Sequence, residues 1–191
     1  MMGWHTGGMN VIFLGLVIWN ILFLAATVLT GMAGRSWHVW HWSLGVITGI
    51  FTCFTHSLVF IQLIGSGKGI KEAVDAYSLP DDPETGYVRR TKKFKGRAFP
   101  YAMFVPMITI AAAWLGAWHD TNSFAAPQWR PTSHQWHMWV AWVAIVTNLY
   151  AFWKEYQVIA ENTRMIREIN DLIQQKGTKD GVAAEKSGIQ A

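Results

Sequence analysis

Four long apolar runs limit what this chain can fold into. They cover residues 9–34, 41–64, 97–118 and 135–153, and each is about as long as the ~20 residues that a helix needs to cross a bilayer. The first run carries no charged residue, and its apolar side chains would lie nearly all round a helix. A helix of a soluble bundle would instead show a polar face at 3.6-residue spacing. The sequence therefore predicts an all-α integral membrane protein, a four-helix bundle.

The basic residues predict how these helices are oriented. With four crossings, the amino terminus, the connection between the second and third runs, and the carboxyl tail lie on one side of the membrane. That side holds all of the sixteen Lys and Arg residues except Arg35 and Arg130, so the positive-inside rule makes it cytoplasmic. We therefore expect a multi-pass protein of the cell inner membrane with both termini in the cytoplasm. The net charge of +4 follows membrane sidedness, and no nucleic acid is expected as a partner.

The parts outside the bilayer predict contact surfaces and no catalytic domain. Residues 67–77 have the pattern of a short amphipathic helix on the membrane surface, and the basic run 89–93 is expected to meet anionic lipid. No Gly or Pro occurs in residues 132–176, so the fourth helix should continue to about residue 176, with a seam of isoleucines suited to packing on another subunit or on the cytoplasmic loop. Residues 177–191 are small, polar or charged, and are expected to be a disordered tail.

The chain also looks internally duplicated. A shift of 99 residues lays the motif at residues 37–40 on the motif at residues 136–139. This match predicts two helical hairpins related by an axis along the membrane normal, with the second and fourth helices parallel. The alternative is coincidence in a Trp-rich chain, because the interfacial belts of membrane proteins enrich Trp at helix ends.

Histidines gather at one end of three predicted helices. Residues 37–42 and 134–139 each hold two histidines three positions apart at the start of an apolar run, and a fifth histidine follows the third run. The five residues are His38, His41, His119, His134 and His137. Ionisable side chains that face a bundle interior are usually functional. The alternative is an interfacial role, in which the rings bond to headgroups and water.

A b-type haem is one ligand that this layer of histidines would suit. Two axial imidazoles approach the iron from opposite sides, so they should come from different helices at equal depth. His38 or His41 meets this condition with His137, and either one meets it with His119. Neighbouring tryptophans, among them Trp40 and Trp118, would pack against the porphyrin. We expect the haem between the second and third or the second and fourth helices.

A bare metal ion is a second interpretation of the same layer. Two histidines three positions apart on a helix lie about 5 Å from each other and can share an ion, and imidazole suits copper, zinc, iron and nickel. The metal candidates are His41, His137, His119, His134 and, deeper in the bilayer, His56. Copper is the alternative cofactor, because a hydrolytic zinc or di-iron centre would need more carboxylate than Asp120 supplies.

His56 lies alone in the cytoplasmic half of the second run. The 99-residue shift places Glu155 opposite His56, with Tyr150 nearby. This group suits proton exchange at a quinone headgroup, or a second haem with Met103 or Met107 as axial ligand. Two other interpretations stay open: Glu155 extends to the cytoplasmic interface, and His56 is a core residue bonded to a neighbouring carbonyl.

Four spans with histidines at helix ends, here His38, His41, His119 and His137, resemble the b-type cytochrome anchors of quinone-linked membrane oxidoreductases such as succinate dehydrogenase and fumarate reductase. The resemblance covers residues 9–153 and rests on architecture. Here the histidines crowd one face, and His56 lacks a clear second ligand. The resemblance implies an electron-transfer subunit with one or two haems, membrane or peripheral partner subunits, a quinone, and no catalysis by this chain alone. A redox-silent structural or assembly subunit and a metal-binding membrane protein are the alternatives.

Overall fold

The computed structural model describes residues 6–82, 86–122 and 130–188. Within these ranges the chain forms four long helices and no strand, which confirms the predicted all-α class. A short 3-10 helix, Arg35–Trp37, joins the first two helices. The four helices are α1 (Thr6–Met32), α2 (His38–Tyr77), α3 (Tyr87–Asn122) and α4 (Arg130–Gly188).

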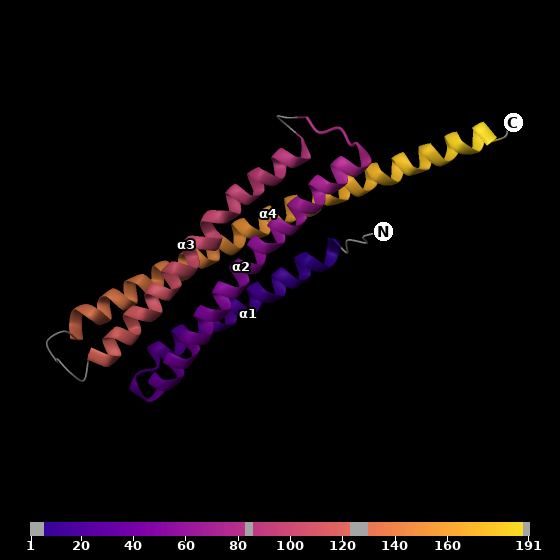
Figure 1. The fold of residues 1–191 in the computed structure, drawn as a ribbon. Helices are drawn as coiled ribbons and strands as arrows, with labels where there is room; N and C mark the ends of the chain where they lie inside the picture. Colours follow the sequence, from indigo (N-terminus) through magenta and orange to yellow (C-terminus); the bar gives the residue numbers. More distant parts are fainter. Residues whose placement is uncertain (1–5, 83–85, 123–129, 189–191) are drawn as a thin grey trace.

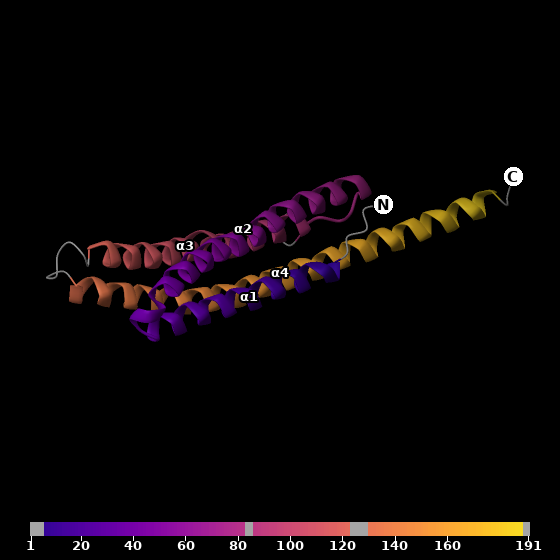
Figure 2. The same cartoon turned by 90° about the horizontal axis from the view of Figure 1, so that it is seen from below.

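The helices lie side by side in an elongated bundle (Figures 1 and 2). α1 and α2 form one antiparallel hairpin, α3 and α4 form a second, and α2 also packs along α3. The start of α1, the end of α2 and the long extension of α4 point to one end of the molecule. The turn between α1 and α2 lies at the other end, together with the end of α3 and the start of α4.

Three of the four helices are long and apolar enough to cross a membrane. Their apolar segments are Asn10–Met32, His38–Tyr77 and Tyr87–Trp118. The predicted run at residues 135–153 of α4 is not among them, because several tryptophans, His137 and Asn148 lower its mean hydropathy. The structure therefore supports three of the four predicted crossings by length and composition.

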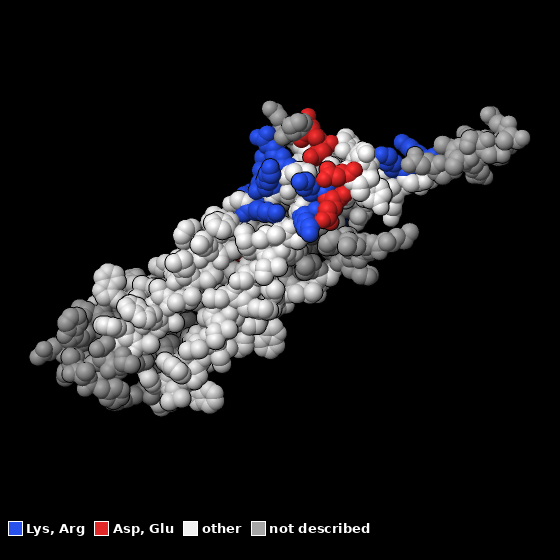
Figure 3. Space-filling view, in the orientation of Figure 1, with Lys and Arg blue, Asp and Glu red and all other residues white. Residues whose placement is uncertain are grey.

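Charged side chains gather over one end of the bundle, where α2 ends and α3 begins (Figure 3). Two ion pairs there join α3 to α4: Arg90 to Glu168 at 2.9 Å and Arg97 to Glu161 at 2.7 Å. All four side chains are more than a third exposed, and exposed pairs contribute little because water screens them.

We expect Arg97→Gln to lower the free energy of unfolding by less than about 1 kcal/mol. The replacement removes one half-exposed ion pair and leaves the buried helix contacts intact. Reversible denaturation in mixed detergent micelles would measure the change. A loss of several kcal/mol would mean that this pair holds α3 and α4 together.

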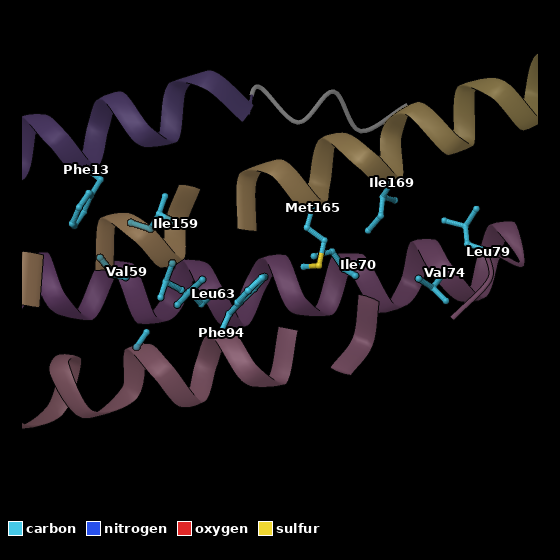
Figure 4. Packing of buried hydrophobic residues seen from close by; sticks show 12 residues of the cluster. Phe13, Val59, Leu63, Ile70, Val74, Leu79, Phe94, Ile159, Met165 and Ile169 are labelled. Atoms are coloured by element: carbon cyan, nitrogen blue, oxygen red, sulfur yellow. The ribbon is translucent and has the colours of Figure 1, made fainter. Parts of the chain in front are cut away.

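The main apolar core lies in the same half of the bundle (Figure 4). Ile70 and Val74 of α2 are buried in it with Met165 and Ile169 of α4. Residues 67–77 are therefore the last turns of a continuous α2, and the predicted surface helix is corrected. The isoleucine seam of α4 packs on this chain's own α2, and Lys176 donates to the carbonyl of Tyr77 at 2.6 Å beyond it.

The fourth helix runs further than the sequence indicates. α4 continues through Gly177 to Gly188, although we expected the ordered chain to end near residue 176. The residues after Gly177 include Ala183, Ala184, Glu185 and Lys186, which are good helix formers. Local propensity therefore favours a helix in this segment.

Candidate functional site

Two of the five clustered histidines meet between the hairpins. The rings of His41 on α2 and His137 on α4 have centroids 6.0 Å apart and planes at 77°. Because His41 belongs to the first hairpin and His137 to the second, this contact joins the two halves of the bundle. His38 is the exposed first residue of α2. The side chains of His119 and His134 lie outside the described residues, so their expected roles have no structural counterpart here.

Each of the two rings is oriented by a backbone carbonyl of its own hairpin. Nδ1 of His41 lies 2.8 Å from the carbonyl oxygen of Thr27 on α1, and Nδ1 of His137 lies 2.9 Å from that of Ala112 on α3. A carbonyl oxygen only accepts, so both Nδ1 atoms donate. In a neutral ring this places the lone pair on Nε2. Metal-binding histidines typically have this arrangement, in which an acceptor bonded to the other ring nitrogen fixes the tautomer.

Each ring packs against a glycine, where a larger residue would overlap it. A Cβ added to Gly31 would lie 2.8 Å from Cε1 of His41, and one added to Gly116 would lie 2.9 Å from Cε1 of His137. A helical side chain covers the turn that precedes it. Gly31 and Gly116 each stand four residues after the carbonyl that accepts the bond, so the missing side chain exposes that carbonyl to the ring.

The two hairpins thus repeat one arrangement in a register that the sequence did not predict. The carbonyl, glycine and histidine contacts equate His41 with His137, a shift of 96 residues (41 to 137). The predicted shift of 99 residues equated His38 with His137 instead. In the corrected register the pattern His-x-Trp-His at residues 38–41 lies on residues 134–137. Short Trp- and His-rich motifs match in both registers, and only the packing distinguishes them.

Small residues line the bundle interior below this pair. Gly49 of α2 is buried, yet a Cβ added there would meet no described atom within 4 Å apart from its own helix. Thr48, Ala112 and Ala144 are also buried. Gly49 is eight residues from His41, which is about 12 Å along the helix. The room for an added side chain at Gly49 therefore lies about two helical turns along α2 from His41.

The tryptophans expected to cover a cofactor point elsewhere. Trp40 is 62% exposed and Trp118 is 49% exposed. Rings with this exposure face the surroundings of the bundle, as in the aromatic belts of membrane proteins. These exposed fractions give no contact of Trp40 or Trp118 with the ring pair, and their role in packing a porphyrin stays a prediction.

A second cluster lies deeper in the bundle, around His56. Nδ1 of His56 is 2.8 Å from Oε1 of Glu155, and Nε2 is 3.2 Å from Oδ1 of Asn148. All three side chains have no exposed surface. The ring of Phe152 stacks on the imidazole, with centroids 5.0 Å apart and planes at 12°. The sequence correctly placed Glu155 opposite His56.

Hydrogen bonds around Asn148 fix the proton on one side of this imidazole. Nδ2 of Asn148 donates to the carbonyl of Ala144 at 2.7 Å and to Oγ1 of Thr109 at 2.9 Å, and Thr109 donates to the carbonyl of Val105. The amide oxygen must therefore face His56, so Nε2 carries a proton and donates. Nδ1 then shares one proton with Glu155, as imidazolium and carboxylate or as imidazole and carboxylic acid.

This geometry corrects several predictions for the inner group. Both nitrogens of His56 are used in hydrogen bonds, which leaves no lone pair for a metal or haem iron. Met103 and Met107, the expected axial ligands of a second haem, are 49% and 58% exposed and point away. Tyr150 contacts Tyr101 and Lys154 on the outer surface of the bundle instead of joining His56 and Glu155.

The sequence interpretation missed the partners that hold both clusters. Asn148 and Asn20 are fully buried amides inside apolar runs, and Asn20 bonds Thr52 and Thr55 of α2 at 2.8 and 3.1 Å. An amide at bilayer depth is a signal of an interhelical contact that the sequence does carry. Gly31 and Gly116 gave no such signal, because their role depends on which helix passes over them.

No family model, curated protein or solved structure matches this chain. Among the described side chains, no three or more His, Cys, Asp or Glu residues are grouped to bind a metal ion. The site is therefore interpreted from its own geometry.

Proposed function

We propose that this protein is a membrane-embedded electron-transfer subunit that holds one b-type haem between His41 of α2 and His137 of α4. The observation that carries the proposal is the pair of rings, which come from two hairpins and are each oriented through Nδ1. A metal-bound imidazole nitrogen lies about 2 Å from its metal, so two axial rings have centroids about 6 Å apart.

The proposed membrane arrangement has four crossings and cytoplasmic termini. α4 lies along α3 over the length that includes its run at residues 135–153 (Figures 1 and 2), which supports a fourth crossing of lower hydropathy. The charged end of the bundle carries nearly all described Lys and Arg residues (Figure 3), as the cytoplasmic side of an inner-membrane protein does. The basic run at residues 89–93 on this side suits contact with anionic lipid or a peripheral partner subunit.

The decisive measurement is a visible spectrum of the full chain, produced with haem available and purified in detergent, before and after reduction with dithionite. We expect a Soret band that shifts on reduction. Elemental analysis of the same sample distinguishes the alternatives. Copper or zinc without a Soret band would identify a bare metal site, and neither haem nor metal would identify a structural or assembly subunit.

Replacing either ligand should remove the haem. We expect His41→Ala and His137→Ala each to lose most of the bound haem while the protein still inserts and folds, because each ring supplies one side of the iron. His38→Ala is the matched control: it removes a histidine from the same motif, one turn away on the same helix, and should keep the haem. Haem retained in both ligand variants would refute this site.

A further inference from the structure

The buried His56–Glu155 pair carries an atom that the fold leaves without a partner. Oε1 of Glu155 accepts from His56, whereas Oε2 has no hydrogen-bond partner among the described residues. The side chain is 0% exposed. A buried carboxylate oxygen without a donor is costly, so Oε2 is the atom of the pair whose hydrogen-bonding capacity is unused.

The hydrogen bonds around the pair leave Oε2 as the atom that can accept a further proton. Nε2 of His56 holds its proton against Asn148, and the second proton lies between Nδ1 and Oε1. In this state the pair has no net charge. A third proton on Oε2 converts the carboxylate to a carboxylic acid, keeps the Nδ1–H bond to Oε1, and gives the pair one positive charge.

No other charged group compensates Glu155 from the helices that pack around it. α1 contains no titratable residue, and between residues 98 and 118 α3 contributes only Tyr101. α2 offers Cys53, which is partly buried, and α4 offers Tyr150, Lys154 and Tyr156. Nζ of Lys154 lies 4.5 Å over the ring of Trp153, which is 53% exposed, and so points to the bundle surface. The charge of the pair is therefore set by its own protons.

A second buried amide lies on the same face of α4 as Glu155, closer to the charged end. Asn162 lies seven residues after Glu155, on the same face of α4, and is 1% exposed. Its Oδ1 accepts from Ser66 of α2 at 3.3 Å, and its Nδ2 has no partner among the described residues. This second buried amide lies between the pair and the end that carries the basic side chains. The position of this amide favours the charged end as the side that supplies the proton.

We propose that the His56–Glu155 pair is a proton-binding site that takes up one proton on Oε2 of Glu155 when the haem accepts an electron. The coupling to the haem rests on the proposed function, whereas the proton site stands on the cluster alone. The electron comes from an external one-electron donor and the proton from water on the cytoplasmic side. Reduction removes one positive charge from the haem and protonation adds one to the pair, so the bundle interior keeps its net charge.

The test is the pH dependence of the haem midpoint potential in the purified full chain, between about pH 5 and pH 8. Because reduction binds a proton, the potential should fall as the pH rises. One proton per electron would change the equilibrium tenfold per pH unit, so the largest slope that this coupling allows is about 59 mV per pH unit. Glu155→Gln keeps the oxygen that accepts from His56 but binds no proton, so its potential should be flat. Glu161→Gln, on the surface of the same helix, should keep the slope of the unchanged protein.

A haem midpoint potential that does not change with pH in the unchanged protein overturns the proposal, and this result requires no variant. A slope that persists in Glu155→Gln overturns it as well. If the chain binds no haem, the proposed function fails, and infrared spectroscopy of the same sample still tests the proton site. A carboxylic acid band that titrates with pH and is missing in Glu155→Gln supports the site. The lack of any such band at every pH overturns it.

Discussion

Glu155→Ala is expected to destabilise the folded protein by about 3–5 kcal/mol, the typical cost of breaking a buried ion pair by removing one partner. The change leaves His56 with a buried Nδ1 that has lost its acceptor, next to a cavity where the carboxylate was. Phe152 packs over the imidazole and α2 and α4 enclose it, so the ring cannot reach water without opening the bundle. The free energy of unfolding in mixed micelles measures this cost.

Two variants control for the loss of charge and of volume. Glu161→Ala removes a carboxylate from the same helix, but its partner Arg97 is half-exposed, so the cost should stay under about 1 kcal/mol. Replacing both His56 and Glu155 with Leu should cost less than Glu155→Ala alone, because apolar side chains can substitute for a buried pair, even though Asn148 loses a donor. A Glu155→Ala variant as stable as Glu161→Ala would show that the buried pair does not hold the helices together.

Gly31→Ala and Gly116→Ala are expected to displace His41 and His137, the two proposed haem ligands. Each added methyl group would overlap an imidazole ring, at 2.8 Å in one hairpin and 2.9 Å in the other. The ring must swing away and give up its hydrogen bond to Thr27 or Ala112. We expect a cost of about 1–3 kcal/mol from overpacking and a loss of most of the bound haem, measured by the Soret absorbance per protein.

Gly65→Ala is the control, and we expect it to change the free energy of unfolding in the opposite direction. Gly65 is an exposed residue inside α2, and a Cβ added there meets no described atom within 4 Å apart from its own helix. Since alanine favours a helix over glycine by about 1 kcal/mol, this variant should be slightly more stable and keep its haem. Equal effects of the three substitutions would show that Gly31 and Gly116 matter only through helix propensity.

Helix propensity and hydropathy predicted the positions of the helices more accurately than their ends. The predicted second span stops at residue 64, before Gly65, Gly67 and Gly69, whereas α2 continues to Tyr77. Gly67 is buried, and a Cβ there would lie 2.9 Å from the side chain of Lys95 on α3. Glycine weakens an isolated helix, but Gly67 allows α3 to approach α2 closely. The local sequence does not show that α3 lies there.

The contact between His56 and Glu155 was predicted from the 99-residue shift, which the contacts of His41 and His137 do not follow. The 99-residue shift paired these two residues, and the structure brings them together. His41 and His137, which make equivalent carbonyl and glycine contacts, are 96 residues apart, whereas the carbonyls and glycines they contact are 85 residues apart (27 to 112 and 31 to 116). The partner of His56 is chosen by packing across the bundle rather than by equivalence within a repeat, so a correct contact followed from an incorrect alignment.

The sequence by itself determined that the chain is helical, that long apolar segments suit a bilayer and that the charges gather at one end, because these properties depend on composition and spacing along the chain. Only the tertiary structure decided that His41 and His137, and not His38, form the central pair. The direction of a side chain depends on how each helix is rotated about its axis. Here that rotation is fixed by the places where one helix can approach another closely, at Gly31, Gly116 and the buried amide of Asn148.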